Sequence, residues 1–497
     1  MAAGYRRLVA LGGAAQVMLE SSSLIALAPM VCVTAAAIAA MTAEAFRAPG
    51  ESLPIGPLGY IGLVGAAAAS FFLWDRHASS YGVVVADNFG LFVTWILILV
   101  GLLSLAASSA TYIAGRRPSG EYYALMLFAI AGMILMAMAT DLLVIFLALE
   151  VLSLAVYVLT GIGRDSPIAT EAAFKYFLLG AFSSAFFLYG IAFTYGLSGS
   201  TRLDRIAGTV PALASSPTQL RWVALGLLMV GFAFKVSAVP FHMWTPDAYE
   251  GAPSVVTGFM SAGVKTAAFA AFVRVFPGAL APFKTEWIGV LQIVAVATMI
   301  GGTIVALVQT SVKRMLAYSS IAHGGYMLVA LTSVGDAGKG AVLFYLLTYA
   351  VANLGAFGVV ASIERLERPI GEVKDFAGLA TDRPLLAALM TTFLLSLGGI
   401  PPFGGFVAKW YVFTAAIQAG YTWLAVVGVL TSVVAVYFYL RIVVMMYMTP
   451  ADSLPVPTSG SPPARAALVA SAAIALYLGI LPAEVLGWAS ASIRSLF

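Results

Sequence analysis

Apolar runs of about 20 residues follow one another along nearly the whole chain, and this pattern limits the possible folds more than any other feature. A run of this length crosses the hydrocarbon core of a bilayer as an α-helix. Only 10% of the 497 residues are charged, whereas a soluble domain carries about 25% charged residues. We therefore predict an all-α, polytopic integral membrane protein.

The apolar runs predict about fourteen transmembrane helices. They lie near residues 22–42, 57–74, 88–112, 122–139, 141–162, 171–198, 220–240, 253–276, 287–308, 314–333, 340–363, 384–419, 422–448 and 464–488. Most connections between them are short, so we expect no inserted soluble domain. Arg6 and Arg7, followed by an apolar stretch, resemble the start of a signal peptide, but no small-residue cleavage site follows them. We therefore expect residues 1–20 to remain as an uncleaved extension.

The residue inventory excludes several kinds of functional site. A single cysteine, Cys32, cannot build a disulfide framework, an iron-sulfur site or a cysteine-based zinc site. The three histidines, His77, His242 and His323, show no ligand spacing, so we predict no metal site. No glycine-rich dinucleotide loop follows a strand, so we expect no cofactor and no catalytic residue in this chain. The net charge of +4 gives no reason to expect a nucleic acid partner.

Five ionisable side chains lie inside predicted spans, where a charge is costly and usually functional. They are Glu150, Lys175, Lys235, Lys265 and Lys409. A buried lysine loses its proton readily, whereas arginine keeps its charge, so lysine suits a group that passes protons on. A neighbouring carboxylate favours the charged lysine, and a change in that pairing would switch its proton affinity. We predict a buried proton relay; structural ion pairs would account for one pair and leave several lysines without a partner.

Lys235 stands just before a predicted break in its helix. Pro240, five residues later, lacks a backbone donor, and its ring clashes with the preceding turn. In a bilayer such a break is tolerated only where protein or trapped water satisfies the freed backbone groups. A second break, at Pro401 and Pro402 in the twelfth predicted helix, precedes Lys409. Broken helices beside ionisable groups are typical of ion paths, although a lysine that reaches the membrane surface from a helix end would also explain Lys235.

The two breaks also indicate an internal repeat. Pro240 aligns with Pro402 at an offset of 162 residues, and Tyr176 aligns with Tyr345 at an offset of 169. Five helices in each copy is an odd number, so the second copy would be inverted in the membrane, as in many transporters. The predicted divisions are residues 1–121 with the extension and helices 1 to 3, 122–276 with the first repeat, 287–448 with the second, and 464–497 with the last helix.

Four passages resemble the antiporter-like membrane subunits of respiratory complex I, or NADH-quinone oxidoreductase. They are Phe234-Lys235-Val-Ser-Ala-Val-Pro-Phe-His-Met-Trp-Thr-Pro-Asp-Ala-Tyr-Glu-Gly-Ala-Pro253, Ala172-Ala-Phe-Lys175-Tyr, Lys313-Arg-Met-Leu-Ala-Tyr-Ser-Ser-Ile-Ala-His323-Gly-Gly-Tyr326 and Gly399-Ile-Pro-Pro-Phe-Gly-Gly-Phe-Val-Ala-Lys409. The first passage is the most specific. Because position 409 is lysine, where a related subunit is expected to carry glutamate, the chain resembles the group called subunit N.

The resemblance implies a role for each ionisable residue. Glu150 and Lys235 match a glutamate and a lysine that pair with each other. Lys265 matches the lysine that connects two half-channels, and Lys409 matches the residue of the outlet half. Lys175 matches a further lysine of the family. For His323 two interpretations stay open: a member of the relay, or a polar histidine that only packs.

The resemblance also implies partners and cofactors. Flavin mononucleotide (FMN), iron-sulfur clusters and quinone would be held by partner subunits. The partners would be other antiporter-like subunits and the quinone-proximal membrane subunits, all within the lipid bilayer of a bacterial inner (plasma) membrane.

Two functions from different classes remain. The first is a proton-translocating subunit of NADH-quinone oxidoreductase, which moves protons along the buried Glu/Lys relay while partner subunits reduce quinone. This chain would then be part of an enzyme without redox chemistry of its own. The second is a subunit of a multi-subunit cation/proton antiporter, which shares this fold. A purely structural membrane scaffold would leave the buried lysines unexplained.

Overall fold

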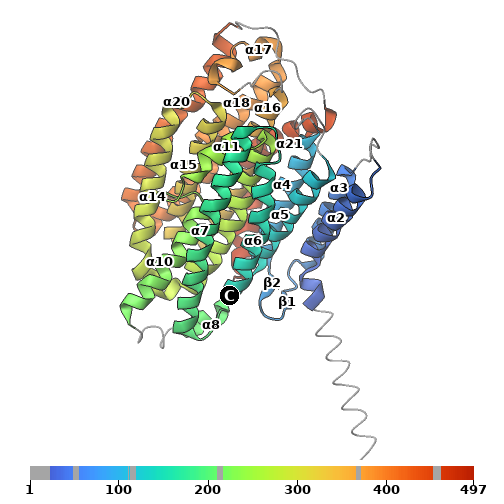
Figure 1. Cartoon of the computed structure of the whole chain (residues 1–497). Coiled ribbons are helices and arrows are strands. Elements are labelled where there is room, and N and C mark those ends of the chain that lie inside the picture. The colour runs from blue at the N-terminus through green and yellow to red at the C-terminus, as the bar shows by residue number, and fades with distance from the viewer. Residues whose placement is uncertain are drawn as a thin grey trace, which may run out of the picture.

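A computed structural model describes residues 23–48, 55–109, 111, 119–209, 217–364, 371–450 and 461–496 as a bundle of helices (Figure 1). The elements up to the first break are α2 (Ala28–Ala45), α3 (Gly56–Leu73), β1 (Ala78–Ser80), β2 (Val84–Ala86), α4 (Asn88–Ser108), α5 (Gly120–Met138), α6 (Leu142–Thr160), α7 (Pro167–Ser198), α8 (Leu203–Gly208) and α10 (Thr218–Lys235).

The elements after the first break complete the bundle. They are α11 (Trp244–Gly251), α12 (Ser254–Phe259), η1 (Met260–Val264), α13 (Lys265–Val273), η2 (Arg274–Ala279), η3 (Ala281–Phe283), α14 (Lys284–Leu307), α15 (Val312–Thr332), α16 (Asp336–Ile363), η4 (Val373–Phe376), α17 (Leu379–Asp382), α18 (Pro384–Gly398), α19 (Gly404–Gln418), α20 (Thr422–Met448), α21 (Pro462–Ile480) and α22 (Ala483–Ile493).

The all-α membrane fold expected from the sequence is confirmed. In the described residues, 11 helical stretches are long and apolar enough to cross a membrane. The three other predicted ranges coincide with α10, with α15, and with the pair α18 and α19, which are shorter or less apolar. The count of fourteen spans and the two inverted repeats stay predictions.

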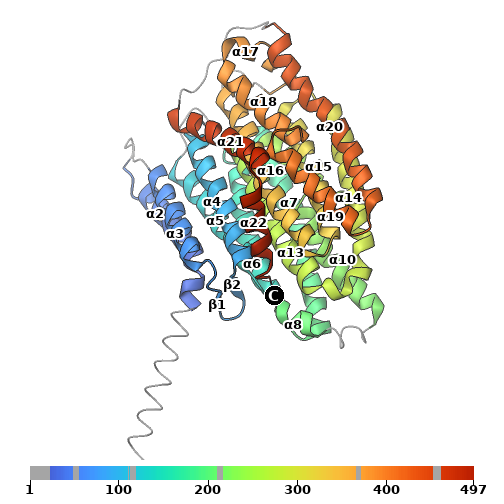
Figure 2. The same cartoon turned by 180° about the vertical axis from the view of Figure 1, so that it is seen from behind.

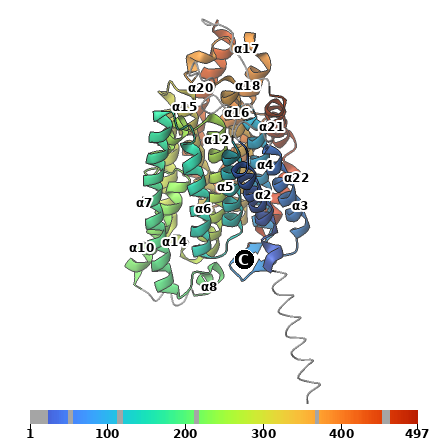
Figure 3. The same cartoon turned by 45° about the vertical axis from the view of Figure 1, so that its right-hand side comes forward.

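The bundle has a buried centre and two exposed edges. The helices α2 and α3 form one edge and α14 and α20 the opposite one (Figures 1 and 2). Between them, α16 and the continuous stretch from α12 to η2 are almost entirely buried. From the side, α7, α6 and α5 stand next to one another in front of this centre (Figure 3). The candidate site lies along these central elements.

Both predicted breaks fall between two helices of the structure. The helix α10 ends at Lys235 and α11 begins at Trp244, with Pro240 between them. The helix α18 ends at Gly398 and α19 begins at Gly404, with Pro401 and Pro402 between them. Proline cannot donate to the carbonyl of the preceding turn, so the chain leaves the helix in both places.

Three details differ from the predictions or lie outside them. The last predicted span, 464–488, consists of two helices, because Pro482 separates α21 from α22. The hairpin of β1 and β2 was not predicted. Its two strands pair at three positions, and it connects the end of α3 to the start of α4. The predicted N-terminal extension, residues 1–20, lies outside the described residues.

Candidate functional site

Three of the predicted lysines lie buried inside the bundle. The exposed fraction is 2% for Lys235, 2% for Lys265 and 5% for Lys409. They come from different elements, since Lys235 ends α10, Lys265 begins α13 and Lys409 lies on α19. Each ammonium contacts a serine hydroxyl and lies over a tyrosine ring, and none forms an ion pair with an acid within the described ranges.

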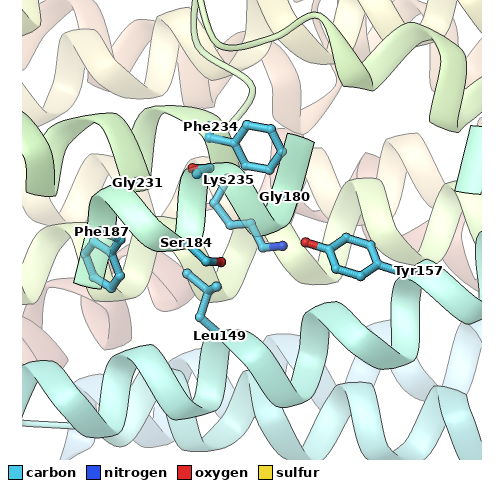
Figure 4. A pocket seen from close by; sticks show the side chains of 9 residues that line it. Leu149, Tyr157, Gly180, Ser184, Phe187, Gly231, Phe234 and Lys235 are labelled. Atoms are coloured by element: carbon cyan, nitrogen blue, oxygen red, sulfur yellow. The ribbon is translucent and has the colours of Figure 1, made fainter. Parts of the chain in front are cut away.

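Lys235 is held where α10 ends. Its Nζ donates to Ser153 Oγ at 2.7 Å and lies 5.5 Å from the ring centres of both Tyr157 and Tyr176. The negative end of a helix dipole and the faces of aromatic rings both favour a cation. Figure 4 shows the Lys235 ammonium and the Tyr157 hydroxyl directed toward each other beside a cavity of about 10 Å³. That volume suits one water molecule.

Glu150 does not contact Lys235 directly. Its carboxylate accepts a hydrogen bond from Ser184 of α7, while Lys235 reaches Ser153, one turn further along α6. No ion pair joins Glu150 and Lys235 in the described part of the chain. Glu150 stands on α6 and Lys235 reaches the same helix one turn further along, so the pairing implied by the resemblance stays a prediction.

Lys265 follows a widened turn of its helix. The preceding residues form the π-helix η1, and Lys265 itself donates to the hydroxyl and the carbonyl of Ser320 on α15. The Tyr349 hydroxyl donates to the Ser320 hydroxyl at 2.7 Å, and the Tyr349 ring centre lies 5.6 Å from the Lys265 ammonium. π-Helical turns occur often at functional sites. Lys265 is thus joined to both α15 and α16.

His323 lies at the centre of a tyrosine network. It is 4% exposed and follows Ser320 by one turn on α15. Its Nδ1 lies 2.7 Å from the Tyr345 hydroxyl and its Nε2 lies 3.2 Å from the Tyr439 hydroxyl. These contacts tie α15 to α16 and α20. Groups that both donate and accept hydrogen bonds surround the ring, as proton transfer requires.

Lys409 is held by the end of the helix before its own. Its Nζ donates to the carbonyl oxygens of Leu397 and Gly398, each at 3.0 Å, and to Ser432 Oγ at 2.7 Å. The ring centre of Tyr326 lies 5.1 Å away. The last carbonyls of a helix have no partner within that helix. The break between α18 and α19 therefore supplies the ligands for this ammonium.

Gly399 makes room for the Lys409 side chain. Its φ of +80° is one that residues with a Cβ rarely adopt, and a Cβ here would lie 2.8 Å from Lys409 Cδ. Only glycine fits both the turn and the lysine.

Lys175 is not brought together with the other lysines. Its side chain is 44% exposed, near the end of the bundle where α7 begins. It forms ion pairs with Glu171 at 2.6 Å and with Asp247 of α11 at 3.0 Å, and Arg314 also binds Asp247. The structure thus places Lys175 beside the broken helix, in a cluster that ties α7, α11 and α15 together.

The sequence interpretation overlooked the hydroxyl groups that hold the lysines. The signal was present as helical spacing, since Glu150, Ser153 and Tyr157 fall on one face of α6. The sequence interpretation also overlooked a buried ion pair, in which Arg274 Nη1 donates to Asp87 at 2.8 Å. No group of three His, Cys, Asp or Glu side chains that could hold a metal occurs in the described ranges.

The arrangement can pass protons between ionisable groups. Lys265, the serine and tyrosine hydroxyls next to it, His323 and its tyrosines follow one another across α13, α15 and α16. Lysine, histidine and hydroxyl groups each accept and release protons, whereas the site lacks the acidic cluster expected of a metal centre in its described residues. The hydrogen bonds between these groups therefore suit proton movement.

Known proteins share this sequence and fold. The transmembrane family described as NADH:quinone oxidoreductase/Mrp antiporter matches residues 139–435. NADH-quinone oxidoreductase subunit N of Trichlorobacter lovleyi is 46% identical over 438 residues, which are 88% of this chain and 90% of that protein. A chain of respiratory complex I from Thermus thermophilus superposes with a TM-score of 0.79 at 35% identity, covering 93% of this chain and 99% of that chain. A chain of the Mrp complex from a Dietzia species shares the fold at 22% identity, with a TM-score of 0.73, covering 97% of this chain and 95% of that chain.

Proposed function

The chain belongs to the NADH:quinone oxidoreductase/Mrp antiporter transmembrane family, and we propose that it translocates protons as the subunit N of an NADH-quinone oxidoreductase. The relatives that carry this name match nearly the whole chain. Protons would move along Glu150, Lys235, Lys265, His323 and Lys409, driven by quinone reduction in partner subunits. Lys175 would act at the edge of this path by holding α11 through Asp247.

One observation carries the proposal. Three lysines are buried with no acid in contact among the described residues, and each meets a hydroxyl and an aromatic face. Burying an ammonium costs several kcal/mol unless an ion pair or hydrogen bonds compensate for the lost water. A scaffold would gain more from methionine or leucine at these positions. Lysines of this kind are explained by a role in which they gain and lose a proton.

The proposal assigns the redox chemistry to other chains. FMN, iron-sulfur clusters and quinone would be bound by partner subunits, and the neighbours in the membrane would be other antiporter-like subunits and the quinone-proximal subunits. The relatives named above are bacterial, which supports the bacterial inner membrane as the location.

The test compares a buried lysine with an exposed one. Lys265→Met keeps the length of the side chain and removes the titratable group, whereas Lys284→Met changes an exposed lysine at the start of α14. In vesicles that contain equal amounts of assembled complex, the number of protons moved per NADH oxidised should fall for Lys265→Met alone. If the Lys265→Met complex moves as many protons as the unmodified one, the relay is wrong.

The alternative function has a separate test. A subunit of a cation/proton antiporter would be isolated with partners that lack flavin and iron-sulfur clusters, and its proton flux would depend on sodium. We expect flavin and iron-sulfur absorbance in the complex purified through this chain, and proton movement that follows NADH oxidation without sodium.

A further inference from the structure

A stripe of polar side chains runs along the buried stretch from α12 to α13. Thr257, Ser261 and Lys265 follow one another at intervals of four residues, and the first two are fully buried. Residues four apart lie on the same face of a helix. This face meets α16, whose Asn353 donates to the Ser261 hydroxyl.

From Thr257 the stripe continues to the end of the bundle at which α16 ends. The Thr257 hydroxyl donates to the Tyr249 carbonyl at 3.0 Å and lies 3.5 Å from the Ala252 carbonyl. The same Ala252 oxygen accepts from Lys313 Nζ at 2.8 Å, and Lys313 forms an ion pair with Glu364 at 3.4 Å. Glu364 is partly exposed, so the stripe reaches the surface at its carboxylate.

In the other direction, the stripe continues from Ser261 to Lys265 through side chains of α16. Tyr349 stands one turn from Asn353 on the same face of this helix, and its hydroxyl donates to Ser320, which binds Lys265. Three intervals lack a direct contact. Lys313 and Thr257 both donate to the Ala252 carbonyl and do not contact each other, and the other two intervals are Thr257 to Ser261 and Asn353 to Tyr349. The last two span one helical turn, about 5–6 Å between Cβ atoms, and one bridging water suits each of the three.

Two fully buried polar atoms beside these intervals have hydrogen-bonding capacity left. They are Asn353 Oδ1 and Ser254 Oγ, neither of which has a partner within the described residues. Buried polar atoms in folded proteins almost always bond to protein or to ordered water. Both atoms therefore favour water within the stripe rather than dry packing.

We propose that this stripe is a proton-access path that leads from Glu364 to Lys265, with Asn353 as its positioning residue. It rests on the proposed function and adds a route by which Lys265 takes up protons without passing Lys235. The neutral Lys265 amine would form a new N–H bond with a proton from its hydrogen-bonded neighbour. Lys313 and each hydroxyl or water along the stripe would give up one proton and accept another from the side of Glu364, so that every group ends as it began. The Ala252 carbonyl and the Asn353 amide would take up no proton and would only position their neighbours.

The alternative is a structural role, in which these side chains only hold the helices together. Interhelical hydrogen bonds between serine, threonine and asparagine are common in membrane proteins. Dry packing and a hydrated path differ in one property, which is whether water reaches Thr257 and Ser261.

Thiol labelling measures that property without any pumping assay. Cys32→Ala removes the one cysteine of the sequence, and Thr257→Cys or Ser261→Cys then places a thiol in the stripe. Thr266→Cys is the matched control, because Thr266 is a fully buried threonine of the same helical stretch whose hydroxyl, within the part of the chain that the structure describes, bonds only to the Ala262 carbonyl. A thiol reacts as the thiolate, which forms only where water reaches it.

The reagent is methanethiosulfonate ethylammonium, applied to the assembled complex, with the labelled peptide of this chain read by mass spectrometry. We expect the two stripe cysteines to react about tenfold faster than the control or more, since burial in apolar surroundings suppresses the thiolate. Equal rates at all three positions would mean that the stripe is dry, and the path would be rejected.

A second measurement tests the path through proton movement. Asn353→Leu keeps a similar volume and removes the polar groups, and Glu364→Gln removes the surface charge. Ser362→Ala is the control on α16, because among the described residues the Ser362 hydroxyl bonds only to the Gly358 carbonyl of its own helix. We expect the first two to lower the number of protons moved per NADH, by no more than Lys265→Met does, because the proposed path ends at Lys265. Ser362→Ala should match the unmodified complex.

Lys265→Met, measured in parallel, separates the two proposals. If Lys265→Met leaves proton movement intact, the proposed function fails. If Lys265→Met abolishes it while Asn353→Leu and Glu364→Gln do not change it, the function stands and the path is wrong.

Discussion

The Nζ atom of Lys409 lies 3.0 Å from the carbonyl oxygen of Gly398, the last residue of the helix that precedes its own. Lys235 is placed differently, because it is itself the last residue of α10 and reaches across to Ser153. In both cases the lysine lies next to a proline-containing break that cuts a helix short, and for Lys409 the ammonium lies at the negative end of that helix. The breaks thus provide sites for buried cations.

We expect Lys409→Arg to stop proton release at this site while the complex still assembles. A guanidinium keeps its proton throughout the physiological pH range, and the loss of a proton-transferring side chain typically costs about 10²–10⁴ in rate. The measurement is the number of protons moved per NADH in vesicles. Lys409→Glu, which remains titratable, should keep more activity than the arginine variant. Arginine and lysine complexes of equal activity would remove Lys409 from the relay.

Glu150→Gln should reduce proton movement and leave the local structure intact. Glutamine offers an amide oxygen to Ser184, so the contact between α6 and α7 survives while the charge is lost. Ser184→Ala, which keeps the carboxylate and loses one hydrogen bond, should have a smaller effect, since such a bond contributes about 1 kcal/mol. Proton movement and the amount of assembled complex are measured for both. An effect of Ser184→Ala larger than that of Glu150→Gln would show that packing matters here more than charge.

Asp87→Asn should destabilise the subunit without changing the stoichiometry of proton movement. Arg274 and Asp87 form a fully buried pair, and removing one charge of such a pair costs about 3–5 kcal/mol because the other charge stays buried. We expect less assembled complex and a lower unfolding temperature. Arg202→Gln is the matched control, because it breaks a largely exposed pair with Asp204, worth about 0–1 kcal/mol. Equal stability of the two variants would contradict this account.

The sequence predicts where the helices lie better than it predicts what the buried side chains touch. Apolar run lengths locate the helices, because the bilayer fixes their length, and prolines locate the breaks, because their chemistry is local. The contact of Lys235 with Ser153 instead of Glu150, and the position of Lys175 at the edge, depend on how each helix is rotated against its neighbours. Helices that are apolar on all sides carry almost no signal for that rotation.

Gly324→Ala tests the connection between Lys235 and Lys265. Gly324 lies on α15 where the segment after α10 approaches Lys265: a Cβ there would lie 3.0 Å from the Val236 carbonyl oxygen and 3.8 Å from Lys265 Nζ. A methyl group would therefore fill the space between the end of α10 and the second lysine with apolar volume. The backbone of Gly324 is helical, so alanine introduces no strain in φ and favours the helix by up to about 1 kcal/mol.

We expect the Gly324→Ala complex to assemble normally, apart from an overpacking cost of about 1–3 kcal/mol, and to move fewer protons per NADH. Gly301→Ala is the control, since its methyl group would make only an ordinary contact, 3.5 Å from the Val239 side chain beside the same break. If both alanine variants moved protons at the unmodified ratio, no proton would cross between Lys235 and Lys265 at Gly324. Each lysine would then exchange protons by its own route, and for Lys265 that route would be the stripe that begins at Glu364.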